Sequence, residues 1–506
     1  MGNEYRVNGR RVRLKVNRHL VALRFDDALT RRGRKAAIEG QQLGSWDERL
    51  EVPNEKCTLL PVRSRRAATR TGKAHDRLIQ HLHSVAGVVR AHAVFDVANG
   101  HAIVTERIAI GLRAGAKPPA IIRERGWKIL ERSADGVLVQ LAPGERPFDV
   151  CAELQHRPGI EYAEPDFALM LGNAGLLAPH VMPVPRAGRG APPREYSIRL
   201  TEADHAWQLV QGDAKVRIAI LDGGLHPMHP DLAPVVFAAW NATTASNVIH
   251  PVAWDWHGTG CAAIAAGASV GAAGVKGVGH GCSLMLVKLG HSTQVNQPWT
   301  TRTSWERRAI DWAWQHHAHV LNLSWGSISP PVASVAAALD RALTKGRRGK
   351  GCVIVVAAGD GDGPVQFPGT HPGVITVSAT NQFDEAKTPR SRDGEKIWGS
   401  SYGPEVSIAA PGVGLYTACA NFERAGLHTF GFSGSSGSAP LVAGAAGLIL
   451  SIRPELSHAE VRKILVSTAD KVGGRPYKRG HNDRLGHGRL NVARAVKRAL
   501  RGRKKR

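Results

Sequence analysis

The sequence predicts an α/β fold, a doubly wound parallel sheet with flanking helices, preceded by a small α+β domain. Two observations support this prediction. From residue 197 onward, short apolar runs rich in β-branched residues alternate with Ala-rich helical stretches, a pattern typical of parallel strands buried between helices. Between residues 76 and 170, strands and two helices are mixed without that regular alternation.

The alternation after residue 197 can be followed element by element. The predicted strands are the runs at 216–221, 283–289, 320–323 and 352–357, and the predicted helices are at 257–268, 305–317 and 332–346. Ser457 and Glu460 have the spacing of a capping box, which predicts a further helix near the C-terminus. In the smaller domain the predicted elements are a helix at 76–85, an Asn–Gly turn at 99–100, a strand at 136–143, a helix within 148–159 and a strand at 160–167.

Changes in composition divide the chain into five segments. Residues 171–196 are rich in Gly, Pro and Ala without periodicity, which indicates a linker and the clearest domain boundary. The predicted segments are a basic region of unknown role at 1–75, the α+β domain at 76–170, the linker at 171–196, the main domain at 197–498 and a basic tail at 499–506.

The formal net charge of +25 belongs mainly to the two ends of the chain. Residues 1–75 hold 18 Lys and Arg against 8 Asp and Glu, residues 471–506 hold 14 against 1, and the remainder holds 35 against 33. A solvated basic surface that aids solubility is the simpler explanation. The alternative is a polyanionic partner, such as nucleic acid, an acidic protein or an anionic membrane surface.

Other features exclude several classes of protein. The six cysteines have neither a Cys-X-X-Cys pair nor Cys/His ligand spacing, so no disulfide framework and no metal site are predicted. The longest strongly apolar stretch, 441–452, is too short to span a bilayer. The polar start of the chain is not a secretory signal, so we expect a cytoplasmic protein. Export by a non-classical route, or a misassigned start, is the alternative.

Three polar residues stand at element ends, where sheets of this kind bind ligands. Asp222 ends a predicted strand, His257 begins an Ala-rich helix, and Ser436 lies among small residues at the start of an apolar helix. A serine needs a base to become a nucleophile, a histidine can be that base, and a carboxylate can orient the histidine. Each residue taken alone is more often a turn, cap or loop residue, but together they predict a nucleophilic site.

The segments around these residues, in the order Asp, His, Ser, resemble the motifs of the subtilisin-like serine proteases, or subtilases. The matching segments are IAILDGGLHPMHPDL, HGTGCAAIAAG and GSSGSAPLVAGAAGL, with VLNLSWG, VIVVAAGDGDG and GHGRLNVARAV among others in family order. The resemblance covers residues 197 to 498. It implies a subtilisin-like fold and an endopeptidase that hydrolyses protein or peptide substrates through Asp222, His257 and Ser436 without a cofactor.

The resemblance also implies roles for neighbouring residues. The edge that pairs with the substrate backbone matches Ser324, Trp325 and Gly326, and one wall of the specificity pocket matches Ala357, Ala358 and Gly359. Trp325 has the alternative explanation of a core residue. Ser435 is a minor rival to Ser436 as nucleophile.

Asp360 departs from the family pattern, which has an asparagine that donates to the oxyanion. An ionised carboxylate has no proton to donate, so Asp360 can line the oxyanion hole only when it is protonated, which a partly buried position favours. We therefore expect an acid-shifted activity optimum. The sedolisins resemble the chain at this aspartate, but their base is a glutamate, whereas His257 lies in a full histidine motif. A catalytically weak protease fold kept for binding is the alternative.

Two further segments bear on metals. Residues 267–277 lack the amide and carboxylate side chains with which many subtilases hold calcium, so calcium is not expected there. The histidines at 316, 317 and 319 are dense enough for a metal site, but we expect ordinary residues at a helix end.

Residues 136–167 resemble the last half of the family's propeptide. The resemblance implies a precursor whose propeptide assists folding, inhibits the site as an intramolecular partner and is removed by self-cleavage. We expect the cut between residues 168 and 196, because a Gly- and Pro-rich segment is suited to proteolysis.

Overall fold

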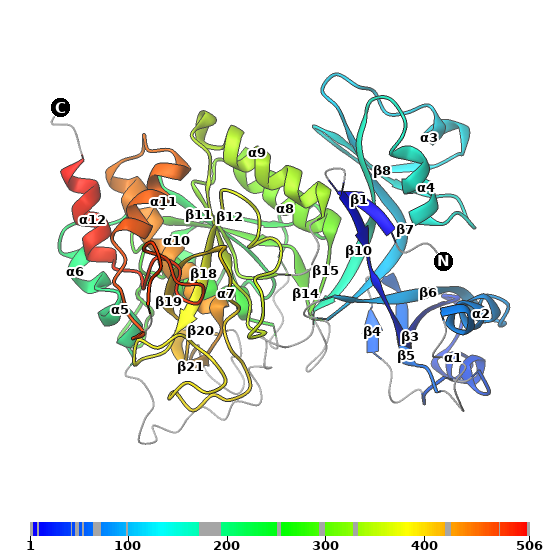
Figure 1. Ribbon diagram of the computed structural model, residues 1–506, viewed down its shortest axis with the longest axis horizontal. Helices are drawn as coiled ribbons and strands as arrows, with labels where there is room; N and C mark the ends of the chain where they lie inside the picture. Colours follow the sequence, from blue (N-terminus) through cyan, green and yellow to red (C-terminus); the bar gives the residue numbers. More distant parts are fainter. Residues whose placement is uncertain are drawn as a thin grey trace. The chain divides into compact units, whose positions relative to one another are not determined.

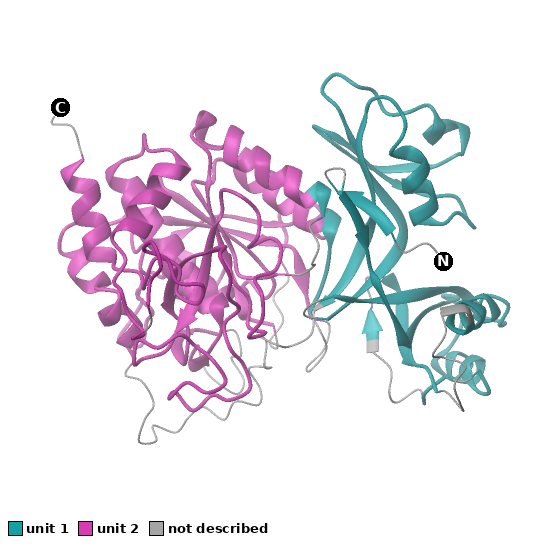
Figure 2. Cartoon of the chain, viewed as in Figure 1, with its two compact units in different colours: residues 1–171, 297–304, 330–334 teal, residues 172–296, 305–329, 335–506 magenta. Residues whose placement is uncertain are grey.

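The structure is a computed structural model. It describes residues 4–7, 10–41, 43–45, 50–52, 55–63, 72–97, 100–171, 194–249, 255–292, 299–326, 332–419, 427–474 and 476–502. The chain divides into two compact units (Figure 2). Unit 1 comprises Met1–Leu171, Gln297–Ser304 and Pro330–Ser334, and unit 2 comprises Gly172–Asn296, Trp305–Ser329 and Val335–Arg506.

Unit 2 is built on a seven-stranded sheet in the order β12-β13-β11-β16-β17-β18-β19, in which every neighbouring pair is parallel. Figure 1 labels β11, β12, β18 and β19 of this sheet. The strands are β11 (Arg217–Asp222), β12 (Val236–Asn241), β13 (Ser283–Lys288), β16 (Val320–Leu323), β17 (Val353–Ala357), β18 (Ile375–Thr380) and β19 (Val406–Pro411). Its central strands are buried on both faces, which explains why they read as continuous apolar runs. The predicted parallel α/β fold is confirmed.

Helices and one hairpin complete unit 2. They are α5 (Tyr196–Leu200), α6 (Ala203–Trp207), α7 (His257–Ala266), α10 (Ser435–Ile452), α11 (His458–Ser467), α12 (Val492–Arg501), the hairpin β20 (Leu415–Ala418) and β21 (His428–Phe432), and all but the first two residues of α8 (Thr303–Gln315) and α9 (Ala333–Gly349), which belong to unit 1. Residues of α7, α10, α11 and α12 share one apolar core with alternate residues of the sheet. The predicted capping box is present, because the Ser457 hydroxyl accepts from the Glu460 N–H and the Glu460 carboxylate accepts from the Ser457 N–H.

Helix α10 lies at the centre of this core. Among the described residues it is the one helix that is long and apolar enough to cross a membrane, but 94% of that stretch is buried inside the structure, as in a core helix.

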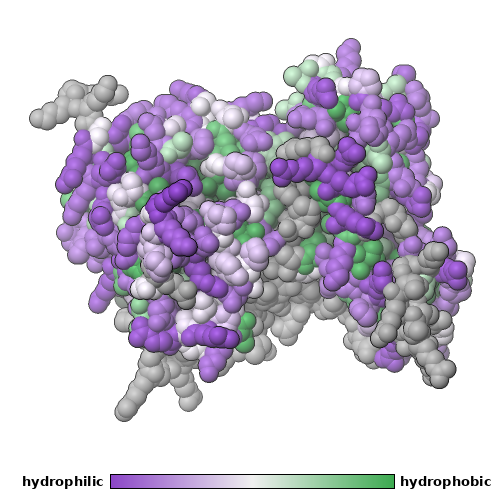
Figure 3. Space-filling view, in the orientation of Figure 1, coloured by the Kyte–Doolittle hydropathy of each residue, from purple (hydrophilic) through white to green (hydrophobic). Residues whose placement is uncertain are grey.

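On the face drawn in Figure 3, hydrophilic residues predominate and apolar ones form small separate groups.

Unit 1 contains an antiparallel sheet in which the strands follow the order β15-β10-β7-β6-β3-β5-β4. In addition, β9 pairs with β7, and β8 pairs with β9. The elements of unit 1 are β1 (Glu4–Val7), β2 (Arg10–Arg13), β3 (Lys15–Phe25), α1 (Arg31–Ile38), β4 (Leu50–Val52), β5 (Cys57–Pro61), α2 (Gly72–Leu82), β6 (Val88–Val97), β7 (Gly100–Leu112), α3 (Ile121–Glu124), β8 (Lys128–Ser133), β9 (Gly136–Gln140), α4 (Pro147–Leu154), β10 (Ile160–Leu171) and β15 (Trp299–Arg302). Helices α3 and α4 pack with β7, β9 and β10, whereas α2 packs with β3, β5 and β6.

The basic region 1–75, whose role the sequence left open, supplies strands to this sheet. Strand β3 pairs with β6 across the boundary predicted at residue 75, and its apolar residues form a core with α2. Residues 172–193 of the predicted linker and 503–506 of the predicted tail lie outside the described residues.

Candidate active site

Asp222, His257 and Ser436 each stand at the end of a regular element in unit 2. Asp222 is the last residue of β11, His257 the first residue of α7, and Ser436 the second residue of α10. Because parallel strands all end at one edge of the sheet, the fold brings together polar residues that are far apart in the sequence.

A buried hydrogen bond joins the first two residues. The Oδ1 atom of Asp222 lies 2.9 Å from Nδ1 of His257 and also accepts from the Gly223 N–H at 2.7 Å. The Asp222 side chain is 4% exposed and the His257 side chain 11%. Burial by itself lowers the pKa of His257, but the charge and hydrogen bond of Asp222, together with those of Cys261, raise that pKa well above its usual 6.5. The carboxylate therefore fixes the ring orientation and stabilises the imidazolium.

The Ser436 hydroxyl donates to the Ser324 carbonyl oxygen at 3.1 Å. A hydroxyl has one proton, so in this rotamer the proton is directed to Ser324 and a rotation about Cα–Cβ is needed to aim it at His257. Ser435, the rival nucleophile, is fully buried, and its hydroxyl accepts from the Gly359 N–H at 3.0 Å. Ser436 is 8% exposed, and is therefore the more accessible of the two serines.

Asp360 follows β17 and lies against the first turn of α10. Its Oδ1 atom accepts from the Ser435 N–H at 2.7 Å. Burial raises the pKa of Asp360 from 3.8 to about 6, although the hydrogen bond from Ser435 favours the charged form. A Cβ atom built on Gly434 would lie 2.9 Å from the other carboxyl oxygen, Oδ2, and 3.6 Å from the Ser436 nitrogen. The Oδ2 atom and the Ser436 N–H therefore border the same space, which Gly434, at φ +140°, leaves open.

The six residues with predicted substrate contacts lie just beyond two neighbouring strand ends. Ser324, Trp325 and Gly326 follow β16, while Ala357 ends β17 and Ala358 and Gly359 follow it. The Trp325 ring is buried, and its N–H donates to the Leu221 carbonyl at 2.9 Å, so its side chain occupies the core. The roles of all six residues toward a substrate stay predictions.

Cys261 is a neighbour of the site that sequence reasoning missed. Its Sγ atom lies 4.0 Å from Nδ1 of His257 and donates to the Ser436 carbonyl at 3.5 Å. The spacing of four residues from His257 on a predicted helix was a signal that could have identified it. Ligand atoms of Asp222, His257 and Cys261 lie within 4.8 Å of one another. Burial raises the pKa of the Cys261 thiol, and the protonated thiol is a poor metal ligand, so we interpret the group as a hydrogen-bonded carboxylate–histidine pair beside a buried cysteine.

The dense histidines after α8 have separate partners. His316 Nδ1 lies 2.8 Å from the Trp312 carbonyl, whereas His319 Nδ1 accepts from the Arg217 N–H at 3.2 Å. Both contacts belong to a helix end and the start of the next strand, as expected.

Comparison with known proteins relates the chain to one family over the region that holds this site. A sequence model of the Subtilase family matches residues 213–488. The calcium-dependent protease of Nostoc sp. is 32% identical over 328 residues, which cover 58% of this chain and 48% of that protein. Thermitase of Thermoactinomyces vulgaris is 31% identical over 282 residues, which cover 56% of this chain and 90% of that protein.

The chain spans about half the length of the calcium-dependent proteases it matches. A solved structure, fervidolysin from Fervidobacterium pennivorans, described as a keratinolytic enzyme related to subtilisin, has a TM-score of 0.58 at 21% identity and covers 79% of this chain and 61% of its own. That likeness concerns the fold. The resemblance predicted from the motifs is confirmed by these matches.

Proposed function

This chain belongs to the subtilase family, and from that premise we propose that it is a serine endopeptidase with Ser436 as nucleophile. The observation that carries the proposal is the buried 2.9 Å contact between Asp222 and His257 at the sheet edge where α10 presents Ser436. A buried carboxylate paired with Nδ1 leaves Nε2 as the basic nitrogen of the ring.

In the proposed reaction the Ser436 oxygen attacks the scissile carbonyl carbon while Nε2 of His257 takes its proton. The resulting imidazolium is stabilised by Asp222. The C–N bond then breaks, His257 returns the proton to the leaving amine, and an ester to Ser436 remains. Water, deprotonated by His257, attacks the carbonyl carbon of that ester. The C–O bond to Ser436 then breaks, His257 returns the proton to the Ser436 oxygen, and the acid product leaves.

The negative oxygen formed during attack needs hydrogen-bond donors. The Ser436 N–H lies in the first turn of α10, where backbone N–H groups have no acceptor within the helix. Asp360 supplies a second donor only when Oδ2 carries a proton, because Oδ1 already accepts from the Ser435 N–H. Its raised pKa supports a protonated form in mildly acidic solution.

Substitution of the two serines tests the nucleophile. Ser436→Ala is expected to lower kcat/KM on a peptide substrate by at least about 10⁴-fold, whereas Ser435→Ala is expected to stay within about tenfold of wild type. A serine-directed phosphonate should add its mass to wild type and Ser435→Ala but not to Ser436→Ala. Labelling that survives in Ser436→Ala would contradict the assignment.

A catalytically weak protein that retains the fold for binding is the second candidate. It is favoured by the presence of a carboxylate, Asp360, where the family pattern has an asparagine, and by the Ser436 hydroxyl directed to Ser324. The same phosphonate separates the candidates, because a chain of this kind would take no label at any pH.

We also propose that the chain is a self-processing precursor with residues 76–170 as its propeptide. Two carboxylates of β10 support this. Glu164 is fully buried and accepts from the Ala333 and Ser334 N–H groups at the start of α9, at 2.8 and 2.9 Å. Asp166 is also fully buried and accepts from the Ser304 N–H at the start of α8 at 2.9 Å. Carboxylates are favourable at helix N-termini, so β10 is suited to hold the protease segments at which both helices begin.

Intact mass tests this proposal. Wild type incubated at pH 5 and pH 7.5 should yield a shortened chain cut between residues 168 and 196, and Ser436→Ala should stay full length. Full-length wild type at both pH values would contradict self-processing.

A polyanionic partner stays a proposal for the basic C-terminal region. Arg489 and Arg494 are paired with Asp470 within unit 2, so they contribute less free charge than the sequence suggests. The test variant is deletion of residues 499–506, with salt-dependent retention on DNA as the readout. Deletion of residues 1–75 is not a suitable test, because it would remove β3 from the sheet of unit 1.

A further inference from the structure

The segment 268–276, called the α7 loop from here on, follows the helix that begins with His257. It consists of small residues with one lysine and bends through positive φ angles at Ser269 and Gly271. Such a loop has few side chains of its own to hold it, so its backbone groups need partners from elsewhere.

Asp231 binds the N–H groups of the α7 loop. Its carboxylate accepts from the Val270 N–H at 2.7 Å and the Val275 N–H at 2.9 Å. Nε2 of His428 lies 2.7 Å from the same carboxylate. Both oxygens of Asp231 are therefore engaged by groups of the protein.

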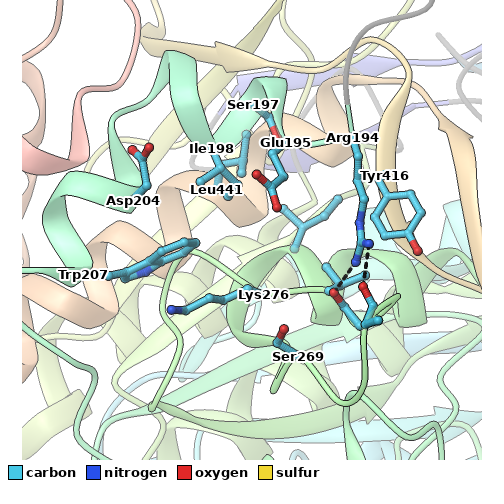
Figure 4. A pocket seen from close by; sticks show the side chains of 14 residues that line it. Arg194, Glu195, Ser197, Ile198, Asp204, Trp207, Ser269, Lys276, Tyr416 and Leu441 are labelled. Carbon is cyan, nitrogen blue, oxygen red and sulfur yellow. Dashed lines mark hydrogen bonds between the residues drawn. The ribbon is translucent and has the colours of Figure 1, made fainter.

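Arg194 and Tyr416 bind three consecutive carbonyls of the loop. Figure 4 shows the two bonds that Arg194 makes. The Arg194 guanidinium donates to the Ala272 oxygen at 2.8 Å and to the Gly274 oxygen at 2.6 Å. The Tyr416 hydroxyl donates to the Ala273 oxygen at 2.7 Å. The guanidinium carbon lies 4.2 Å from the centre of the Tyr416 ring, so the two donors also stabilise each other by a cation–π contact.

These residues do not fit a calcium ion. Calcium takes six to eight oxygen ligands, mostly carboxylates, carbonyls and amides. Here Ser269 has the loop's one side-chain oxygen, its carbonyls 272–274 already accept from Arg194 and Tyr416, and Asp231 already accepts from three N–H groups. The guanidinium also places a positive charge beside the carbonyls that a cation would need.

We propose that Arg194 is a positioning residue that takes the place of a divalent cation in the α7 loop, so that the loop is held without calcium. A guanidinium has a fixed fork of donors, which suits it to bridge two carbonyls two residues apart. Arg194 lies inside the predicted linker, near its C-terminal end, so the mature protease retains Arg194 only if the cut falls before it. This consequence rests on the proposed self-processing. It places the N-terminus of the mature chain at or before Arg194.

The first experiment measures how far Arg194 stabilises the α7 loop, in a chain that cannot cleave itself. The full chain carrying Ser436→Ala serves as parent, and Arg194→Ala, Arg194→Lys and Arg199→Ala are added to it. Arg199 is a matched control, since it lies on α5, is exposed and forms an ion pair with Glu195 at 4.0 Å. We expect Arg194→Ala to lower the melting temperature by roughly 3–10 °C and to speed amide exchange in the α7 loop, with Arg199→Ala unchanged. Arg194→Lys should fall between them, because an ammonium is a point charge.

Calcium supplies the second arm of this experiment. The parent should melt at the same temperature in excess calcium chloride and in EDTA. Two results overturn the proposal: an Arg194→Ala variant that melts and exchanges like Arg199→Ala, or a parent that calcium stabilises by more than about 2 °C over EDTA.

The N-terminal sequence of the mature chain tests the consequence for processing. An N-terminus at or before Arg194 agrees with the proposal, and an active mature chain that begins after Arg194 contradicts it. If wild type is not cut at all, the proposed self-processing fails. The melting experiment still decides whether Arg194 holds the α7 loop.

Discussion

Replacing Asp360 by asparagine should change the pH dependence of kcat/KM more than the maximum value of kcat/KM. With a pKa of about 6, Asp360 is about half protonated at pH 6 and only about 1% protonated at pH 8. Asparagine keeps an oxygen that can accept from the Ser435 N–H and carries donor hydrogens at every pH. The contribution of this donor is therefore lost in wild type as pH rises through about 6, and it is retained in Asp360→Asn.

The size of the effect follows from the protonated fraction. Loss of one oxyanion donor costs about 10²–10³ in rate in a subtilisin. The ratio of kcat/KM for Asp360→Asn over wild type should thus lie near 1 at pH 5 and rise to about 10² at pH 8. Both proteins should lose activity at low pH, because His257 must be neutral to act as base and Asp222 raises its pKa.

The assay is kcat/KM on one peptide substrate from pH 4.5 to pH 9. Asp362→Asn is the matched control, since Asp362 is in the same loop but accepts from Arg484 at 2.8 Å. Its ratio to wild type should not change with pH. A flat ratio for Asp360→Asn as well would refute the reasoning, because a donor that depends on protonation cannot give a constant ratio.

Two further predictions concern unit 1 and the space beside Asp360. Burial raises the pKa of Glu164 to about 7 from 4.5, so the folded state holds the proton more tightly than the unfolded state does. The free energy of unfolding therefore falls, by up to about 3 kcal/mol, as pH rises from 4.5 to 7. Glu164→Gln should flatten that dependence, measured by hydrogen exchange in β10 at pH 5 and pH 8, and an unchanged slope would contradict it. Gly434→Ala should lower kcat/KM by at least about tenfold, because its Cβ would lie 2.9 Å from a carboxyl oxygen at φ +140°. Gly474→Ala, at φ +58° with open space around it, is the control for strain alone and should not affect catalysis.

The parallel sheet of unit 2 and the three candidate catalytic residues could be predicted from the sequence, because their signals are local. Strands that are buried on both faces are apolar at nearly every position, so β16 and β17 can be recognised in the sequence as continuous apolar runs. Asp222 and His257 are recognisable because each stands in a motif at an element end, where the backbone requires small neighbours. The capping box of α11 is local in the same sense, since both partners lie within one turn.

The partners of these residues were decided only by the tertiary structure, because they come from distant parts of the chain. Asp360 receives an N–H from a residue 75 positions away, and the Ser436 hydroxyl is directed to a carbonyl 112 positions away. Arg194 reaches the α7 loop across 78 to 80 residues. No periodicity or motif encodes such contacts. The order of strands in the sheet and the packing of side chains determine them, and the burial that raises the pKa of Asp360 exists only once the chain has folded.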